Sequence, residues 1–171
     1  MKKTHEKDIQ ILQDNLSLLR KLAKWTMEEL GEQVGLTKQT ISNIENKKSI
    51  MTLIQYIAIR TAFDYEIQTN PDNVVLAQAV DILLNKADSY NEEESEKIKA
   101  TMGLLSAAAA GGAKATELSK TATMLFSSMG IAMATPVALV NPLIGAALAG
   151  GVGLWYSKIA KKSKEASLKK K

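Results

Sequence analysis

Apolar residues along this 171-residue chain recur at intervals of three and four, the spacing that places them on one face of an α-helix. In residues 8–24, the apolar positions that share such a face are Ile9, Leu12, Leu16, Leu19 and Ala23. The alternation of apolar and polar residues that is typical of β-strands is scarce. The pattern therefore predicts an all-α fold.

Helix-capping signals divide the next part of the chain into short helices. Thr26 and Glu29 have the spacing of a capping box, in which two side chains satisfy free amides at a helix start. The helix that follows is expected to end near Gly35, because glycine favours the residue after a helix C-terminus. Thr37 is then in position to cap a second helix, over residues 38–46.

A third short helix is expected over residues 53–62, with Thr52 as its cap. The residues expected to point inward from it are Leu53, Ile54, Ile57 and Ala58. The polar stretch over residues 64–73 is expected to form a loop.

Two longer helices are predicted in the middle of the chain. Asn70 followed by Pro71 is a favourable N-cap and first-turn pair, which predicts a helix over residues 71–87. Asn91 is followed by three glutamates, which suit a helix N-terminus and predict a helix over residues 92–110.

The last third of the chain holds no charged residue for 37 consecutive positions, from 121 to 157. Residues 121–140 form a 20-residue run and residues 142–157 a 16-residue run, with a predicted turn between them. A helix needs about 20 apolar residues to cross a bilayer. This segment therefore predicts an apolar helical hairpin that spans the membrane. A hairpin buried inside a soluble oligomer is the alternative.

Residues that favour a membrane interface lie at the end of this hairpin. The aromatic and basic side chains expected at the interface are Trp155, Tyr156, Lys158, Lys161 and Lys162. Because positive charge favours the cytoplasmic side, both termini are expected in the cytoplasm. The lysine-rich tail would bind anionic lipid head groups or, alternatively, DNA phosphates.

The stretch GLTKQTISNIENKK, residues 35–48, places small hydrogen-bonding side chains on one side of a predicted helix. Ile41 and Ile44 lie on the opposite side, where a core is expected. The polar residues that share the exposed side are Lys38, Gln39, Ser42 and Asn43. Side chains of these types hydrogen-bond to base edges in the major groove of DNA. An ordinary solvated helix face is the alternative.

Residues 11–66 resemble the helix-turn-helix domain of the XRE/Cro phage-repressor family. The segments that carry the resemblance are LRKLAKWTMEELGEQVGLTKQTISNIENKK and LIQYIAIRTAFDYE. The resemblance implies a five-helix DNA-binding domain in which the four polar residues above read bases. The phosphate contacts that it implies are those of Thr37, Asn46, Lys47 and Lys48. It also implies that Arg20 pairs with Glu45.

The chain departs from the family pattern in three places. Gly31 stands where the family usually has Ala, and it still allows close helix packing. The family often has a glycine soon after the position of Glu45, whereas this chain has Asn46 and Lys47. A non-glycine residue is therefore expected to make the left-handed turn. The loop KKSIMT also lacks the proline that most members have.

The net charge of +4 is unevenly distributed. Residues 1–70 hold 10 basic and 9 acidic side chains, residues 71–120 hold 5 and 8, and residues 121–171 hold 7 and 1. The segment that resembles a DNA-binding domain is thus almost neutral. Because phosphate contacts dominate affinity for DNA, one such domain is expected to bind poorly alone and to need a dimer.

No enzyme, metal centre or cofactor site is expected. The chain has no Cys and a single His, His5, and it lacks a phosphate-binding glycine loop. The first residues also lack the apolar run of a signal peptide, so this end is expected to stay in the cytoplasm.

These predictions combine into four segments. They are a helix-turn-helix DNA-binding domain over 8–68, a helical spacer able to dimerise over 70–118, the apolar hairpin over 119–160 and the tail over 161–171. The expected function is a sequence-specific, bacterial-type transcription regulator that is tethered to the membrane. Its expected partners are double-stranded DNA, membrane lipid and further copies of itself. The alternatives are a soluble oligomeric repressor, and a membrane-active or interaction protein whose helix-turn-helix recruits a partner.

Overall fold

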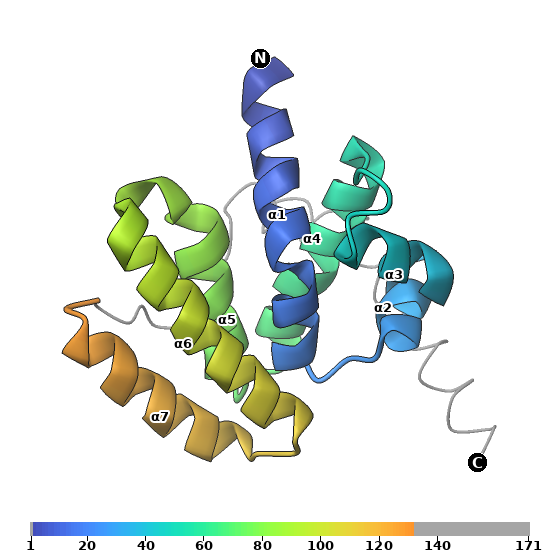
Figure 1. Cartoon of the computed structure of the whole chain (residues 1–171). Coiled ribbons are helices and arrows are strands. Elements are labelled where there is room, and N and C mark those ends of the chain that lie inside the picture. Colours follow the sequence, from blue (N-terminus) through green and yellow to red (C-terminus); the bar gives the residue numbers. More distant parts are fainter. Residues whose placement is uncertain (1, 132–171) are drawn as a thin grey trace, which may run out of the picture.

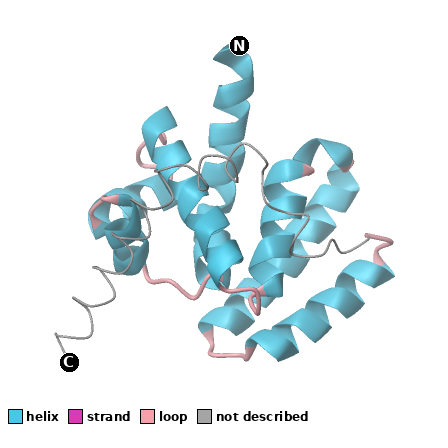
Figure 2. Cartoon of the chain, turned by 180° about the vertical axis from the view of Figure 1, so that it is seen from behind, coloured by secondary structure: helices cyan, strands magenta, loops and turns pink. Residues whose placement is uncertain are grey.

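The computed structural model describes residues 2–131, which form helices joined by turns and loops (Figure 1, Figure 2). No strand occurs in this part of the chain, so the all-α prediction is confirmed for it. The elements are α1 (Lys2–Leu22), α2 (Met27–Val34), α3 (Lys38–Glu45), α4 (Leu53–Thr69), α5 (Val74–Val80), the π-helical turn η1 (Asp81–Asn85), the 3-10 turn η2 (Ala87–Ser89), α6 (Glu92–Ala110) and α7 (Ala115–Ser128).

The longest helix, α1, lies between two groups of helices. In Figure 1, α2, α3 and the beginning of α4 lie on one side of α1, and α5, α6 and α7 lie on the other. Leu12, Leu16 and Leu19 of α1 are fully buried, which confirms the inward face predicted from their spacing. The buried side chains of both groups form one continuous core.

Local capping chemistry sets the starts of four helices as predicted. The side chains of the caps accept hydrogen bonds from the backbone amides three residues further on, and these caps are Thr26, Thr37, Thr52 and Asn91. In α2, α4 and α6, the third-position side chain also accepts a bond from the amide of the cap, at 2.7 to 2.9 Å. Each of these three helices therefore begins with a complete capping box.

α4 extends further than predicted and turns a different face inward. It ends at Thr69 instead of near residue 62, so most of the loop expected over 64–73 is helical. The prediction that Leu53, Ile54 and Ile57 point inward is wrong, because these side chains are exposed. Ala58, predicted with them, is only half-buried. The apolar side chains that α4 buries are Ile59, Ala62, Phe63 and Ile67.

A polar network joins the middle of α4 to η1. Arg60 Nε donates to Asp64 Oδ2 at 3.1 Å, one turn further along the helix, and Arg60 Nη2 donates to Asn85 Oδ1 at 2.9 Å. Asp81 accepts a bond from Lys86 Nζ at 2.6 Å. Burial raises the pKa of Asp64 above its ordinary value, and the nearby positive charge of Arg60 only partly opposes this shift. The i,i+4 pair within α4 favours its continuation beyond residue 62.

The helix that follows α4 does not have the bounds predicted for it, residues 71–87. Asn70 ends α4 instead of capping the next helix, and Asn73 is the cap of α5. Asn73 Nδ2 also donates to the carbonyl oxygen of Leu22 at 3.0 Å, at the end of α1. This tertiary bond explains why the helix begins later than its sequence signal indicates. α5 then continues directly into the wider turn η1.

α6 and α7 pack onto the rest of the molecule. α6 lies against α1, and α7 lies against both α5 and α6. The helix predicted over residues 92–110 is confirmed with those bounds. The buried side chains of the two helices are Ile98, Met102, Leu105, Ser106, Ala109, Leu118, Ala122 and Phe126. Residues 74–128 therefore contribute to the same core as the helix-turn-helix segment.

The first arm of the predicted hairpin is not a single helix over residues 121–140. α7 begins at Ala115 and ends at Ser128, and Gly130 then adopts a φ of 73°. Ala122 and Phe126 are buried, whereas Thr and Ser residues supply much of the exposed side. The polar groups exposed on the outer face of this stretch are hydroxyl groups, and Met124 is exposed beside them.

Within residues 2–131, no helix combines the length and apolar character that a bilayer span requires. The remainder of the predicted hairpin and the lysine-rich tail lie outside the described residues. The same holds for the predicted interface residues Trp155, Tyr156, Lys158, Lys161 and Lys162.

Candidate nucleic-acid interface

A tight turn over residues 35–37 joins α2 to α3. Gly35 adopts the left-handed conformation, with φ 72° and ψ 29°, which glycine reaches without steric cost. The amide of Leu36 donates to the carbonyl oxygen of Gly31 at 2.8 Å. A methyl group on Gly31 would lie 2.5 Å from the carbonyl oxygen of Leu36. The missing side chain thus allows the turn to fold closely onto α2.

The inner face of α3 is anchored in the core. Ile41 and Ile44 are fully buried, as their positions predict. The structure also brings together Arg20 and Glu45, whose side chains are only 8% and 3% exposed. Arg20 Nε and Nη2 donate to the two carboxylate oxygens at 2.6 and 3.0 Å, and Nη1 donates to the carbonyl oxygen of Trp25 at 2.8 Å. A bidentate pair of this kind fixes both distance and orientation, so α3 is held rigidly against α1.

The outer face of α3 presents the four residues predicted to read bases. Lys38 and Gln39 are exposed, and Ser42 and Asn43 are half-buried beside them. Gln39 Nε2 donates to Asn43 Oδ1 at 2.9 Å. This bond orients both amides, and each amide still has further donor and acceptor capacity for a base edge.

The residues predicted to contact phosphates surround the two ends of α3. Thr37 is the N-cap, and its Oγ1 accepts from the amide of Thr40 at 3.1 Å. Asn46 Nδ2 donates back to the carbonyl oxygen of Ser42 at 2.8 Å. Lys47 makes the left-handed turn expected of a non-glycine residue, with φ 57°. Its Nζ lies 2.6 Å from a carboxylate oxygen of Asp14, so a phosphate would compete with this carboxylate for Lys47.

Gln13 is a further residue of the site, and the sequence analysis missed it. Its Nε2 donates to the carbonyl oxygens of Ile44 and Ser49 at 3.0 and 2.8 Å, and its Oε1 accepts from the amide of Met51 at 3.0 Å. This single side chain therefore ties α1 to the loop that follows α3. Its partners are backbone atoms more than 30 positions away, so local spacing holds no signal for the role.

The interface is weakly charged. Between Thr26 and Ser49 the chain has three lysines and four glutamates, one of which, Glu45, is paired with Arg20. The exposed acids of this stretch are Glu28, Glu29 and Glu32 on α2. The sequence-independent attraction to DNA phosphates is therefore expected to be small for one copy of this surface.

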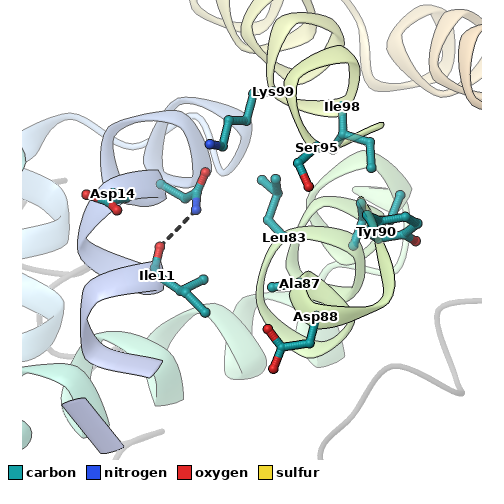
Figure 3. Close-up of a pocket in the computed structure, with 11 residues that line it drawn as sticks. Ile11, Asp14, Leu83, Ala87, Asp88, Tyr90, Ser95, Ile98 and Lys99 are labelled. Atoms are coloured by element: carbon teal, nitrogen blue, oxygen red, sulfur yellow. Dashed lines mark hydrogen bonds between the residues drawn. The ribbon is translucent and has the colours of Figure 1, made fainter. Parts of the chain in front are cut away.

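A separate hollow of about 220 Å³ lies between α1, η1, η2 and the start of α6 (Figure 3). Apolar side chains such as Ile11, Leu83 and Ile98 line it, together with the charged Asp14, Asp88 and Lys99. Its lining belongs to the junction between α1 and the α5–α6 region, and Asp14 in that lining also pairs with Lys47 after α3. In residues 2–131, no cluster of His, Cys, Asp or Glu is arranged to hold a metal ion.

The helix-turn-helix segment supports a general role in DNA-binding transcription regulation. Residues 16–69 match a family model described as helix-turn-helix. The domain that contains these residues is of the XRE/Cro type, which confirms the resemblance found from the sequence. Comparisons with curated proteins and with solved structures gave no match.

Proposed function

We propose that the chain is a sequence-specific regulator that reads duplex DNA with the outer face of α3. The observation that carries this proposal is the division of α3 into two faces. The inner face is buried and tied to α1 by a bidentate ion pair, while the outer face presents only polar side chains. A rigidly held polar helix is suited to dock in the major groove with its N-terminal residues forward.

The side chains of the outer face suggest which bases they would contact. Gln39 and Asn43 are amides, which pair best with the N6 and N7 edge of adenine. Lys38 prefers the O6 and N7 acceptors of guanine. Ser42 can hydrogen-bond to either adenine or guanine. Thr37, Asn46, Lys47 and Lys48 would contact the flanking phosphates, and Lys47 would exchange Asp14 for a phosphate oxygen.

The base-reading role of Gln39 can be tested with a duplex selected from a random pool by the full-length chain. We expect Gln39→Ala to weaken binding to that duplex by about 1–3 kcal/mol in a mobility-shift titration. The variant should also lose preference at one base pair of the site. The matched control is Gln68→Ala, the same change at an exposed position near the far end of α4. Its affinity is expected to equal that of the wild type.

Two outcomes would contradict the proposal. If Gln39→Ala binds the selected duplex as tightly as the wild type does, the outer face of α3 does not read bases. If no duplex is enriched at all, the helix-turn-helix domain is better explained as a surface that recruits a protein partner.

The sequence after α7 favours a second proposal, that this regulator is attached to the membrane. Residues 132–157 form a run of 26 positions without charge, followed by a lysine-rich stretch. About 20 such residues suffice for one span. The DNA-binding domain would then lie in the cytoplasm, where DNA is accessible, and a single span would place the lysine-rich stretch on the opposite side of the membrane.

Membrane attachment is tested by fractionating cells that express the full-length chain and washing the membranes with alkaline carbonate. An integral protein stays in the pellet. Recovery of the chain as a defined oligomer in the soluble fraction would contradict attachment, and would favour a soluble repressor whose C-terminal part supports assembly.

A further inference from the structure

The hollow shown in Figure 3 lies between one turn of α1, one turn of α6 and the two turns η1 and η2. Ile11 and Asn15 of α1 are four positions apart, so their side chains share a helix face. Ser95 and Lys99 of α6 share a face in the same way. Leu83 joins the lining from the π-helical turn η1. Because π-helical turns are rare and occur frequently at functional sites, a hollow beside such a turn is a candidate binding site.

Hydrogen-bond donors gather at one end of this hollow. Asn15 is 9% exposed, and its Nδ2 donates to the carbonyl oxygen of Ile11 at 2.8 Å. An amide nitrogen carries two N–H groups, so Asn15 can still donate to a ligand. Lys99 and Ser95 project from α6 toward this part of α1 (Figure 3). The apolar side chains of Ile11 and Leu83 belong to the same lining, so the hollow combines a polar end with an apolar body.

The charges of the lining favour an anion over a cation. Both aspartates of the lining already have a lysine partner, at 2.6 and 2.5 Å, and the pairs are Asp14 with Lys47 and Asp88 with Lys7. Lys99 is held less closely, because its Nζ lies 3.5 Å from Glu96 Oε1. The two side chains of that pair are 57% and 72% exposed, so water screens their attraction. Lys99 is therefore the charge of the lining that is most readily available to a ligand.

We infer that this hollow binds a small carboxylate anion that carries a short, branched hydrocarbon chain. The carboxylate would pair with Lys99 Nζ and accept hydrogen bonds from Ser95 Oγ and Asn15 Nδ2. Charge-assisted bonds of this kind are stronger than bonds between neutral groups. The hydrocarbon chain would contact Ile11 and Leu83, which removes apolar surface from water. The hollow of about 220 Å³ has the volume of about seven molecules of liquid water, so the ligand is a small metabolite with a similar number of non-hydrogen atoms.

The same turn of α1 contacts the loop that follows α3. Gln13 bonds to backbone atoms of that loop, and Asp14 pairs with Lys47. Asn15 follows directly, on the side of the hollow. A carboxylate that joins Lys99 to Asn15 would hold α1 against α6, and would thereby stabilise the arrangement in which Gln13 positions the loop.

The consequence for DNA binding rests on the proposed function. The carboxylate should raise the affinity of the chain for the selected duplex. By linkage, the duplex should raise the affinity for the carboxylate by the same factor.

Binding is tested by methyl NMR spectroscopy of the purified full-length chain, without DNA and with the isoleucine and leucine methyl groups labelled. A chain that needs detergent for extraction is measured in non-ionic detergent. The probe is isovalerate, which has one carboxylate and a short branched chain. We expect saturable shifts of the methyl signals of Ile11 and Leu83, whereas Ile54, exposed on α4, should not respond. Isopentylamine, which has the same hydrocarbon chain and the opposite charge, should cause no saturable shift.

Two variants separate the roles of charge and of space. Lys99→Gln should raise the dissociation constant of isovalerate at least about 10-fold, because it removes a charge-assisted bond. The matched control, Lys97→Gln, changes a lysine of α6 that pairs with Glu93 outside the lining, and should leave the constant unchanged. Ala87→Leu should abolish binding, because the larger side chain occupies part of the hollow. Circular dichroism verifies that the variants fold.

Three results would each overturn the inference. They are the absence of saturable shifts at Ile11 and Leu83, equal binding of isovalerate by Lys99→Gln and the wild type, and binding of the amine as tight as that of the carboxylate. Because no DNA is present, these results do not depend on whether Gln39 reads bases. An affinity for the selected duplex that isovalerate leaves unchanged would overturn the consequence for DNA binding, whereas failure to select any duplex would contradict only the proposed function.

Discussion

The backbone requires glycine at position 35 but not at position 103. Gly35 ends α2 in the left-handed conformation, with φ 72°. Gly103 lies inside α6, and a methyl group added there would meet no other atom within 4 Å. The backbone at position 35 therefore needs glycine, whereas the backbone at position 103 only loses stability by having it.

Substitution by alanine should separate these two cases. We expect Gly35→Ala to lower the free energy of unfolding by about 1–2 kcal/mol, because an L-residue is strained in the left-handed region. Gly103→Ala should raise it by about 0.5–1 kcal/mol, because alanine is the better helix former. Urea denaturation followed by far-ultraviolet circular dichroism measures both. A free energy of unfolding that is unchanged or raised in Gly35→Ala would disprove the assigned role of Gly35.

The environment of α4 changes along its length. Its first turns expose apolar side chains, whereas its middle buries the pair formed by Arg60 and Asp64. One oxygen of Asp64, Oδ1, is buried without a hydrogen-bond partner in the part of the chain that the structure describes. The buried carboxylate is therefore costly to ionise, which agrees with the raised direction of the Asp64 pKa.

This burial predicts a pH dependence of stability. Because the pKa of Asp64 is raised above its ordinary value of 3.8, the folded protein binds that proton more tightly than the unfolded chain does. The contribution of Asp64 to stability is thus greatest below pH 3.8 and is lost as the pH rises through the folded-state pKa. Asp64→Asn removes the titration. The unfolding free energy of the wild type minus that of the variant should therefore decrease over this window.

Urea denaturation of both proteins at a series of pH values measures this difference. A difference that increases with pH would mean that the Arg60 charge outweighs burial, and that the pKa of Asp64 is lowered instead.

At the scale of the whole molecule, α1 is shared by two groups of helices. The helix-turn-helix segment packs on one side of it and the α5–α7 group on the other, and their buried residues form one core. Trp25 belongs to the first group and stacks on Phe63 with ring centroids 5.5 Å apart. Phe126 belongs to the second group and is fully buried in α7. The shared core predicts that the two groups unfold together.

Phe126→Ala tests this coupling. We expect it to lower the free energy of unfolding by about 3–5 kcal/mol, because a large buried ring is removed. In a Trp155→Phe background, Trp25 is the remaining tryptophan, so its fluorescence reports on the helix-turn-helix segment. The fluorescence and circular dichroism midpoints should shift together. An unchanged Trp25 transition would show instead that residues 70–131 are an independent unit.

Much of the local structure was predictable because its causes lie within a few residues. The caps at Thr26, Thr37, Thr52 and Asn91 satisfy amides three positions away, so the sequence alone determined where those helices begin. The outer and inner faces of α3 followed from helical spacing in the same way. The family match confirms the type of domain, while the base and phosphate contacts assigned to single residues stay predictions.

Other features were decided only by the tertiary structure. Apolar residues occur on both sides of the first half of α4, and the packing of α4 against α1, α2 and α5 determined that Ile59 is buried and Ile54 is not. The bond from Asn73 to the carbonyl oxygen of Leu22, and the bonds of Gln13 to the loop after α3, join residues distant in sequence. A sequence determines which faces are able to pack. Which of them does pack depends on the surfaces that the rest of the chain offers, because burial is a property of pairs of elements and not of single helices.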